Sequence, residues 1–201
     1  MYFFLIAYTV LGAGIKYIDD AFDEKTFNKT LALVITPLLS ILGVYAMMID
    51  PVSATILLAV VCGVFIKGKV DNYAFLTGGI IVISLAFVLG INFLIIPLII
   101  LSTAAVLDEV GNDFIDRKKH RLNMRNPGHI FARYFFGHRW IMKTAIIFLV
   151  LLNIVPVFFV FAMILFDYSY LGVTAYSNTK EKIPDATSMQ KAIATVGYIF
   201  K

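Results

Sequence analysis

Long apolar stretches separated by short polar segments dominate the pattern of this chain. A helix rises about 1.5 Å per residue, so roughly 20 apolar residues are enough to cross a bilayer as a helix. The stretches that lack Asp, Glu, Lys and Arg cover residues 1–15, 30–49, 51–66, 72–107 and 144–166. This pattern predicts membrane-spanning helices rather than the core of a soluble domain.

The fourth stretch is 36 residues long, which is more than one crossing needs. Gly90, Ile91 and Asn92 in its middle predict a tight turn, which divides it into spans at about 73–89 and 93–107. The chain therefore predicts an all-α fold, a polytopic bundle of about six transmembrane helices over residues 1–166. Residues 167–201 form a polar C-terminal tail, part of which has amphipathic spacing.

Composition supports a membrane protein. Apolar residues make up 60% of the 201 residues and charged residues 15%, whereas soluble domains have about 45–50% and 25%. These values exclude a soluble enzyme, a disordered chain and a disulfide-stapled secreted module. The single cysteine, Cys62, forms no intrachain disulfide and belongs to no zinc-type or haem-type spacing.

The positions of the basic residues predict an orientation. Six spans place residues 16–29, 67–72 and 108–143 on one face, and these segments hold 13 of the 17 Lys and Arg residues. By the positive-inside rule this face is cytoplasmic, and the N-terminus lies outside. The net charge of +4 then reflects topology, so we expect no nucleic-acid partner.

Aromatic and basic residues alternate in residues 129–141 of the same face. Tyr134 and Trp140 are typical interfacial anchors, and Arg133 and Arg139 suit lipid headgroups. The segment predicts a helix that lies in the cytoplasmic membrane interface.

Two clusters of acidic residues lie at the predicted cytoplasmic ends of spans. In the first, Asp19 and Asp23 lie four residues apart, with Asp20 beside them, so all share one side of a continued helix. Like charges at this spacing are destabilising unless a cation compensates them. Mg²⁺ is such a cation, because it binds one or two carboxylates together with water and phosphate oxygens.

The second cluster follows the fifth predicted span, where Asn112, Asp113 and Asp116 recur at helical spacing. A basic run begins directly after it at Arg117. Carboxylates for a metal beside cations for phosphate oxygens are the parts of a metal-assisted diphosphate site. The candidate metal ligands are Asp19, Asp20, Asp23, Asn112, Asp113 and Asp116; the candidate diphosphate ligands are Lys67, Lys69, Arg117, Lys118 and Lys119; the secondary candidates are Glu24, Asp71, Asp108 and Glu109.

The two clusters contain the motifs D-D-x-x-D, at 19–23, and N-D-x-x-D, at 112–116. Such motifs at the cytoplasmic ends of membrane helices resemble those of the UbiA-type intramembrane prenyltransferases. In that family, two Asp-rich motifs hold Mg²⁺ and an isoprenoid diphosphate, and the prenyl tail lies between helices. The resemblance implies that the first motif binds one metal ion, the second motif binds another, and residues 117–119 contact diphosphate.

Three functions fit the sequence. The first is a Mg²⁺-dependent, prenyltransferase-like enzyme that acts on a lipid (isoprenoid) diphosphate at the cytoplasmic surface. The second is a divalent-cation transporter or channel, since carboxylates select cations; its difficulty is that the acids crowd one surface, whereas transport sites lie near the midplane. The third is a non-catalytic membrane scaffold. The sequence leaves the substrate, the acceptor and the oligomeric state open.

Overall fold

The computed structural model describes residues 1–23, 26–68, 72–118 and 126–182, and these residues form helices and turns without any strand. The all-α fold is therefore confirmed for the described part of the chain. The side chains of Lys67, Asp116, Lys118 and residues 180–182 are outside the description. The helices are α1 (Tyr2–Phe22), α2 (Lys29–Ile49), α3 (Pro51–Lys67), α4 (Tyr73–Val88), α5 (Ile95–Lys118), α6 (Pro127–Gly137), α7 (Trp140–Leu151) and α8 (Phe158–Lys182).

Several of these helices are long and apolar enough to cross a membrane. α1, α2, α5 and α8 each meet this condition, and the bent pair α6–α7 makes a fifth candidate. α3 and α4 are equally apolar but have only 17 and 16 residues. The described residues thus support an integral membrane protein with four to five candidate spans, and the expected six remain a prediction.

Local signals set several helix starts. Asp50 Oδ1 accepts hydrogen bonds from the backbone N–H groups of Val52 and Ser53, at 2.7 and 3.3 Å, and Pro51 occupies the first turn of α3. This is the arrangement that a helix start with an N-terminal proline favours. Asn28 caps α2 in the same way, and Asn72 caps α4.

The predicted turn at Gly90 is confirmed. Gly90 has φ +60°, a left-handed conformation that glycine adopts without steric cost, and it separates α4 from α5. The backbone N–H of Leu94 donates to Thr55 Oγ1 at 2.8 Å. The start of α5 is therefore tied to α3 at this end of the bundle.

The prediction of a single span at 144–166 is wrong. α7 ends at Leu151, the chain turns through Asn153 at φ +56°, and α8 begins at Phe158 and continues to Lys182. Asparagine tolerates this left-handed conformation better than most residues, and Pro156 lacks the N–H that a continuing helix would use. α8 therefore continues beyond residue 166, at which we expected the bundle to end.

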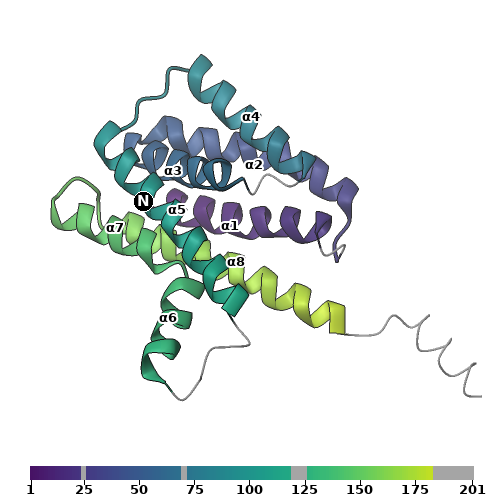
Figure 1. The fold of residues 1–201 in the computed structure, drawn as a ribbon. Coiled ribbons are helices and arrows are strands. Elements are labelled where there is room, and N and C mark those ends of the chain that lie inside the picture. The colour runs from purple at the N-terminus through teal and green to yellow at the C-terminus, as the bar shows by residue number, and fades with distance from the viewer. Residues whose placement is uncertain (24–25, 69–71, 119–125, 183–201) are drawn as a thin grey trace, which may run out of the picture.

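Because of this turn, the C-terminal part of α8 lies on a different face of the bundle from the one that we predicted. Ser177 Oγ donates to Thr26 Oγ1 at 2.9 Å, and the rings of Tyr176 and Phe27 stack at 6.1 Å. The C-terminal part of α8 therefore lies beside the loop that follows α1, as Figure 1 shows. The predicted six-span arrangement placed it on the opposite face, which is wrong for these residues.

α1 lies at the centre of the bundle, between α8 on one side and α2 on the other (Figure 1). Small residues allow the closest helix approaches. A Cβ at Gly12 would lie 2.1 Å from the backbone oxygen of Phe166, and one at Gly63 would lie 2.7 Å from Ala105 Cβ. Such contacts are typical of packing between membrane helices.

α6 stands off the bundle in Figure 1 and bends by 73° from α7. None of its residues is buried, and Phe131 and Tyr134 are exposed on it. We expected one continuous interfacial segment over 129–141. The structure instead divides this segment at residues 138–139, and its position in a membrane interface stays a prediction.

Candidate functional site

A cavity of about 360 Å³ lies within the bundle, and its wall combines apolar and ionisable side chains. Most of the wall, which we call the cavity body, consists of apolar side chains and glycines of α1 to α4, among them Leu11, Leu39, Gly43, Met47 and Val82. The ionisable side chains of the wall, which we call the charged mouth, are Asp19, Asp23, Glu109, Arg139 and Tyr170.

α1 supplies the first two carboxylates of the charged mouth because it continues beyond the apolar stretch to Phe22. Lys16, on the same helix, places its Nζ 2.8 Å from Asp19 Oδ2 and 2.7 Å from Asp20 Oδ1. Asp20 is only 1% exposed and does not line the cavity. A lysine of the chain itself thus compensates the like charges of this cluster.

Arg139 faces this cluster from the bend between α6 and α7. Its Nη2 lies 2.8 Å from Glu109 Oε1, and its guanidinium carbon lies 4.9 Å from the centre of the Tyr170 ring. Lys16 Nζ lies 5.4 Å from the same ring, and the Tyr170 hydroxyl donates to Asp19 Oδ2 over 3.5 Å. Tyr170 therefore lies between two cations, and contacts of this kind are favourable when they are shielded from water.

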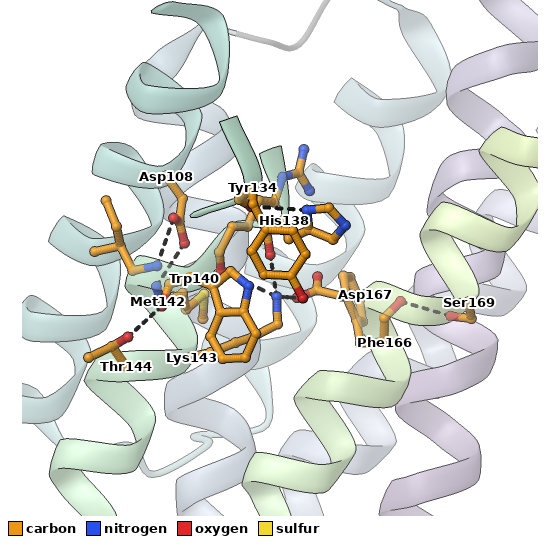
Figure 2. Close-up of polar contacts among 12 residues, drawn as sticks. Asp108, Tyr134, His138, Trp140, Met142, Lys143, Thr144, Phe166, Asp167 and Ser169 are labelled. Carbon is orange, nitrogen blue, oxygen red and sulfur yellow. Dashed lines mark hydrogen bonds and ion pairs between the residues drawn. The ribbon is translucent and has the colours of Figure 1, made fainter. Parts of the chain in front are cut away.

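A second, buried ion pair lies next to the bend, as Figure 2 shows. Lys143 on α7 pairs with Asp167 on α8, and both are buried. Lys143 Nζ also donates to the backbone oxygen of His138 and, at 3.4 Å, to that of Arg139. The pair consequently joins α7, α8 and the irregular backbone of the bend.

Asp108 on α5 binds the start of α7 from a different helix. Its Oδ1 accepts the backbone N–H of Ile141 at 2.9 Å, and its Oδ2 accepts that of Met142 at 2.7 Å (Figure 2). The first N–H groups of a helix lack partners within the helix and need such an acceptor. Asp108 thus acts as a cap across 33 residues of sequence.

The predicted site residues divide between the cavity and other places. From the first cluster, Asp19 and Asp23 reach the cavity, and from α5 the secondary candidate Glu109 does. Asn112 and Asp113 are half-buried on α5 but do not line the cavity, and Arg117 is exposed. Glu24, Lys69, Asp71 and Lys119 lie outside the described residues, as do the side chains of Lys67, Asp116 and Lys118.

Among the described residues, no group of three or more His, Cys, Asp or Glu side chains is arranged to hold a metal ion. Lys16 already compensates Asp19 and Asp20, and Arg139 compensates Glu109. Mg²⁺ commonly uses one or two carboxylates and takes its other ligands from substrate phosphates and water. The charged mouth fits a metal ion that arrives with a phosphate ligand better than a metal ion held by protein alone.

Sequence reasoning missed Lys143, Asp167 and Tyr170 as site residues, and it treated Arg139 only as an interfacial residue. Asp167 carried a usable signal, since it lies within the apolar run of α8. An ionisable residue inside a membrane helix is a functional-site candidate by default. The predicted span ends at residue 166, so Asp167 falls outside it and this signal is lost.

Comparisons of this chain with known protein families, with curated proteins and with solved structures find no match. The resemblance to UbiA-type prenyltransferases therefore stays a prediction, which rests on the two Asp-rich motifs.

Proposed function

We propose that this chain is a membrane enzyme that binds a lipid (isoprenoid) diphosphate together with Mg²⁺ and acts on it as a prenyltransferase does. One observation carries the proposal: the charged mouth and a set of apolar side chains line the same cavity. A ligand that satisfies both parts has a charged headgroup and an apolar tail. The diphosphate lies at the charged mouth, and the tail lies between α1, α2, α3 and α4.

The cavity, of about 360 Å³, gives the tail a space of limited length. An isoprenoid chain that is longer than this space extends beyond the cavity.

The charges of the mouth support a divalent cation. Three of the groups that line the cavity are carboxylates, those of Asp19, Asp23 and Glu109. Each carboxylate repels the charge of a diphosphate. Asp19, Asp23 and Glu109 are the residues that would hold Mg²⁺ together with the ligand, and the ion would supply charge neutralisation for the diphosphate. Binding of the lipid diphosphate should therefore depend on the metal.

The reaction that suits these groups is cleavage of the bond between the prenyl carbon and the diphosphate oxygen. The electron pair leaves on the diphosphate, and the prenyl carbon bonds to a nucleophilic atom of an acceptor, which then loses a proton. Bound Mg²⁺ supplies charge neutralisation to the leaving group. Arg139 faces the same group and holds it by charge-assisted hydrogen bonds.

Cation transport fits the cavity less well. Thr36 and Ser40 supply hydroxyl groups to its wall, and each donates to a backbone oxygen of its own helix. The rest of the cavity body is lined by apolar side chains and glycines. A dehydrated cation would find few oxygen ligands along this path, whereas an apolar tail is stabilised there.

The testing experiment is equilibrium binding of a radiolabelled 15-carbon isoprenoid diphosphate to the protein in detergent, with Mg²⁺ and with EDTA. We expect saturable binding with Mg²⁺ only, and its loss in the double variant Asp19→Asn and Asp23→Asn. Binding that is equal in EDTA would contradict the role of the metal. Absence of binding in a stably folded wild type would leave the scaffold function.

A pair of glycine variants tests the tail separately. Gly43 lines the cavity, and a Cβ there meets only Leu11 Cδ2 at 3.8 Å, so Gly43→Leu fills the cavity body. Gly172 on α8 is exposed, with nothing within 4 Å of a Cβ, so Gly172→Leu is the matched control. We expect binding to fall at least tenfold in the first variant and to stay unchanged in the second. Equal binding in both would contradict the placement of the tail.

A further inference from the structure

The bend between α6 and α7 holds one residue in a conformation that it does not favour by itself. Arg139 has φ +52° and ψ +52°, the left-handed region. For a residue with a Cβ this conformation is costly, and it persists only when surrounding contacts maintain it. The contacts that maintain it lie on three neighbouring helices, α5, α7 and α8.

The first contact holds the backbone after Arg139. Within the described part of the chain, Arg139 as the N-cap residue of α7 makes no side-chain capping bond of its own. Asp108 replaces that cap, because its two oxygens accept the N–H groups of Ile141 and Met142. Asp108 is 2% exposed, so water does not compete for these bonds.

The second contact holds the backbone at and before Arg139. Lys143 Nζ donates to the backbone oxygens of His138 and Arg139 and pairs with Asp167 (Figure 2). N–H groups on one side of the bend and C=O groups on the other are therefore both bound. A side chain that starts from this fixed backbone has few directions in which to extend.

The third contact holds the guanidinium itself. Glu109, the neighbour of Asp108 on α5, pairs with Arg139 Nη2 at 2.8 Å, and the Tyr170 ring lies beneath the guanidinium. Of the two adjacent acids of α5, Asp108 thus binds the backbone that follows Arg139, and Glu109 binds its side chain. Arg139 also lines the cavity, so its guanidinium faces a ligand that binds there.

We infer that Asp108 is a positioning residue, which holds Arg139 in the charged mouth so that its guanidinium binds a phosphate group of the ligand. Guanidinium groups bind phosphate through two parallel hydrogen bonds, and a fixed direction makes this binding stronger. The identity of the ligand rests on the proposed function. The positioning of Arg139 by Asp108 does not, and it is testable without any ligand.

The first test is covalent labelling of arginine side chains with phenylglyoxal, read by mass spectrometry. Asp108→Ala removes both acceptors, whereas Asp108→Asn keeps one. The matched control is Asp50→Ala, because Asp50 caps α3 through the same kind of bonds at the opposite end of the bundle. The exposed Arg133 on α6 is the internal reference.

We expect the labelling rate of Arg139, relative to Arg133, to rise at least fivefold in Asp108→Ala and less in Asp108→Asn. In Asp50→Ala the ratio should stay at the wild-type value. An unchanged ratio in both Asp108 variants would overturn the inference, as would an equal rise in Asp50→Ala. If Asp108→Ala does not fold, the graded rise in Asp108→Asn decides the question.

The second test adds the phosphate ligand and uses Mg²⁺ with either dodecyl diphosphate or inorganic diphosphate. We expect dodecyl diphosphate to protect Arg139 in the wild type and to protect it at least tenfold less effectively in Asp108→Ala. Protection by inorganic diphosphate at the same concentration would make a free anion, rather than a lipid headgroup, the ligand. If neither ligand protects Arg139 but its labelling still rises in the Asp108 variants, the proposed function is rejected and the positioning role of Asp108 stands. Protection that is equal in the wild type and in Asp108→Ala would overturn the positioning role.

Discussion

The two ends of the helix bundle are built on different principles. At one end, short turns join α2 to α3, α4 to α5 and α7 to α8 (Figure 1), and they use single residues such as Asp50, Gly90 and Asn153. Toward the other end, ionisable groups bind one another across helices, as Arg139 and Glu109 do. Buried charges cost free energy unless they are paired. Their concentration away from the connecting turns marks the part of the bundle that holds the candidate site.

The largest expected effect comes from breaking the buried ion pair. Lys143→Met leaves Asp167 as a buried carboxylate without its cation, which should lower the stability by about 3–5 kcal/mol. Unfolding in detergent, followed by circular dichroism, measures this change. A loss below roughly 1 kcal/mol would show that the pair is not shielded from water.

The double variant Lys143→Met and Asp167→Leu sharpens this prediction. It replaces the pair by apolar side chains, and such replacements are often neutral or stabilising in protein interiors. We expect most of the stability lost in Lys143→Met to return, although the bond to the His138 backbone oxygen is lost as well. If the double variant is as unstable as the single one, the contact with the bend outweighs the ion pair.

The next effect concerns binding rather than stability. Arg139→Gln removes a charge-assisted hydrogen bond to phosphate, a loss of about 1.5–3 kcal/mol, or roughly 10- to 150-fold in the dissociation constant. Binding of dodecyl diphosphate with Mg²⁺ measures this change. Arg133→Gln, on the exposed surface of α6, is the control and should bind as the wild type does.

The smallest effect is expected at the connecting end. Asp50→Ala removes a local helix cap and should cost about 1 kcal/mol of stability, with no change in ligand binding, because Asp50 lies away from the cavity. Thermal unfolding and a binding curve on the same preparation measure both quantities. A loss of binding in this variant would show that the two ends do not act independently.

Structural features that are set by residues adjacent in the sequence were predictable from the sequence. The start of α3 follows from Pro51, and the break between α4 and α5 follows from Gly90. Both signals act through the backbone of the residue itself or of its next neighbours. The turn at Asn153 escaped prediction because the stretch around it carries no charge, although Asn153 and Pro156 are local signals for a turn.

That one error also hid part of the site. With residues 144–166 taken as one helix, Lys143 and Asp167 lay on opposite faces of the membrane, whereas the hairpin of α7 and α8 brings them together. Asp19 and Asp23 were predictable because they share a helix side. Arg139, which lines the same cavity, was not, because its pairing with Glu109 joins residues that are far apart in the sequence.

We propose that the charged mouth and the apolar cavity body bind one amphiphile together with a divalent cation. Trp140 is the single tryptophan of the chain and follows Arg139 directly, so its fluorescence reports on the mouth. The decisive measurement is a titration of Trp140 emission with dodecyl diphosphate, in Mg²⁺ and in EDTA. We predict a saturable change with Mg²⁺ only, absent in the Asp19→Asn and Asp23→Asn double variant. A change that is identical in EDTA, or that persists in the double variant, would contradict the account.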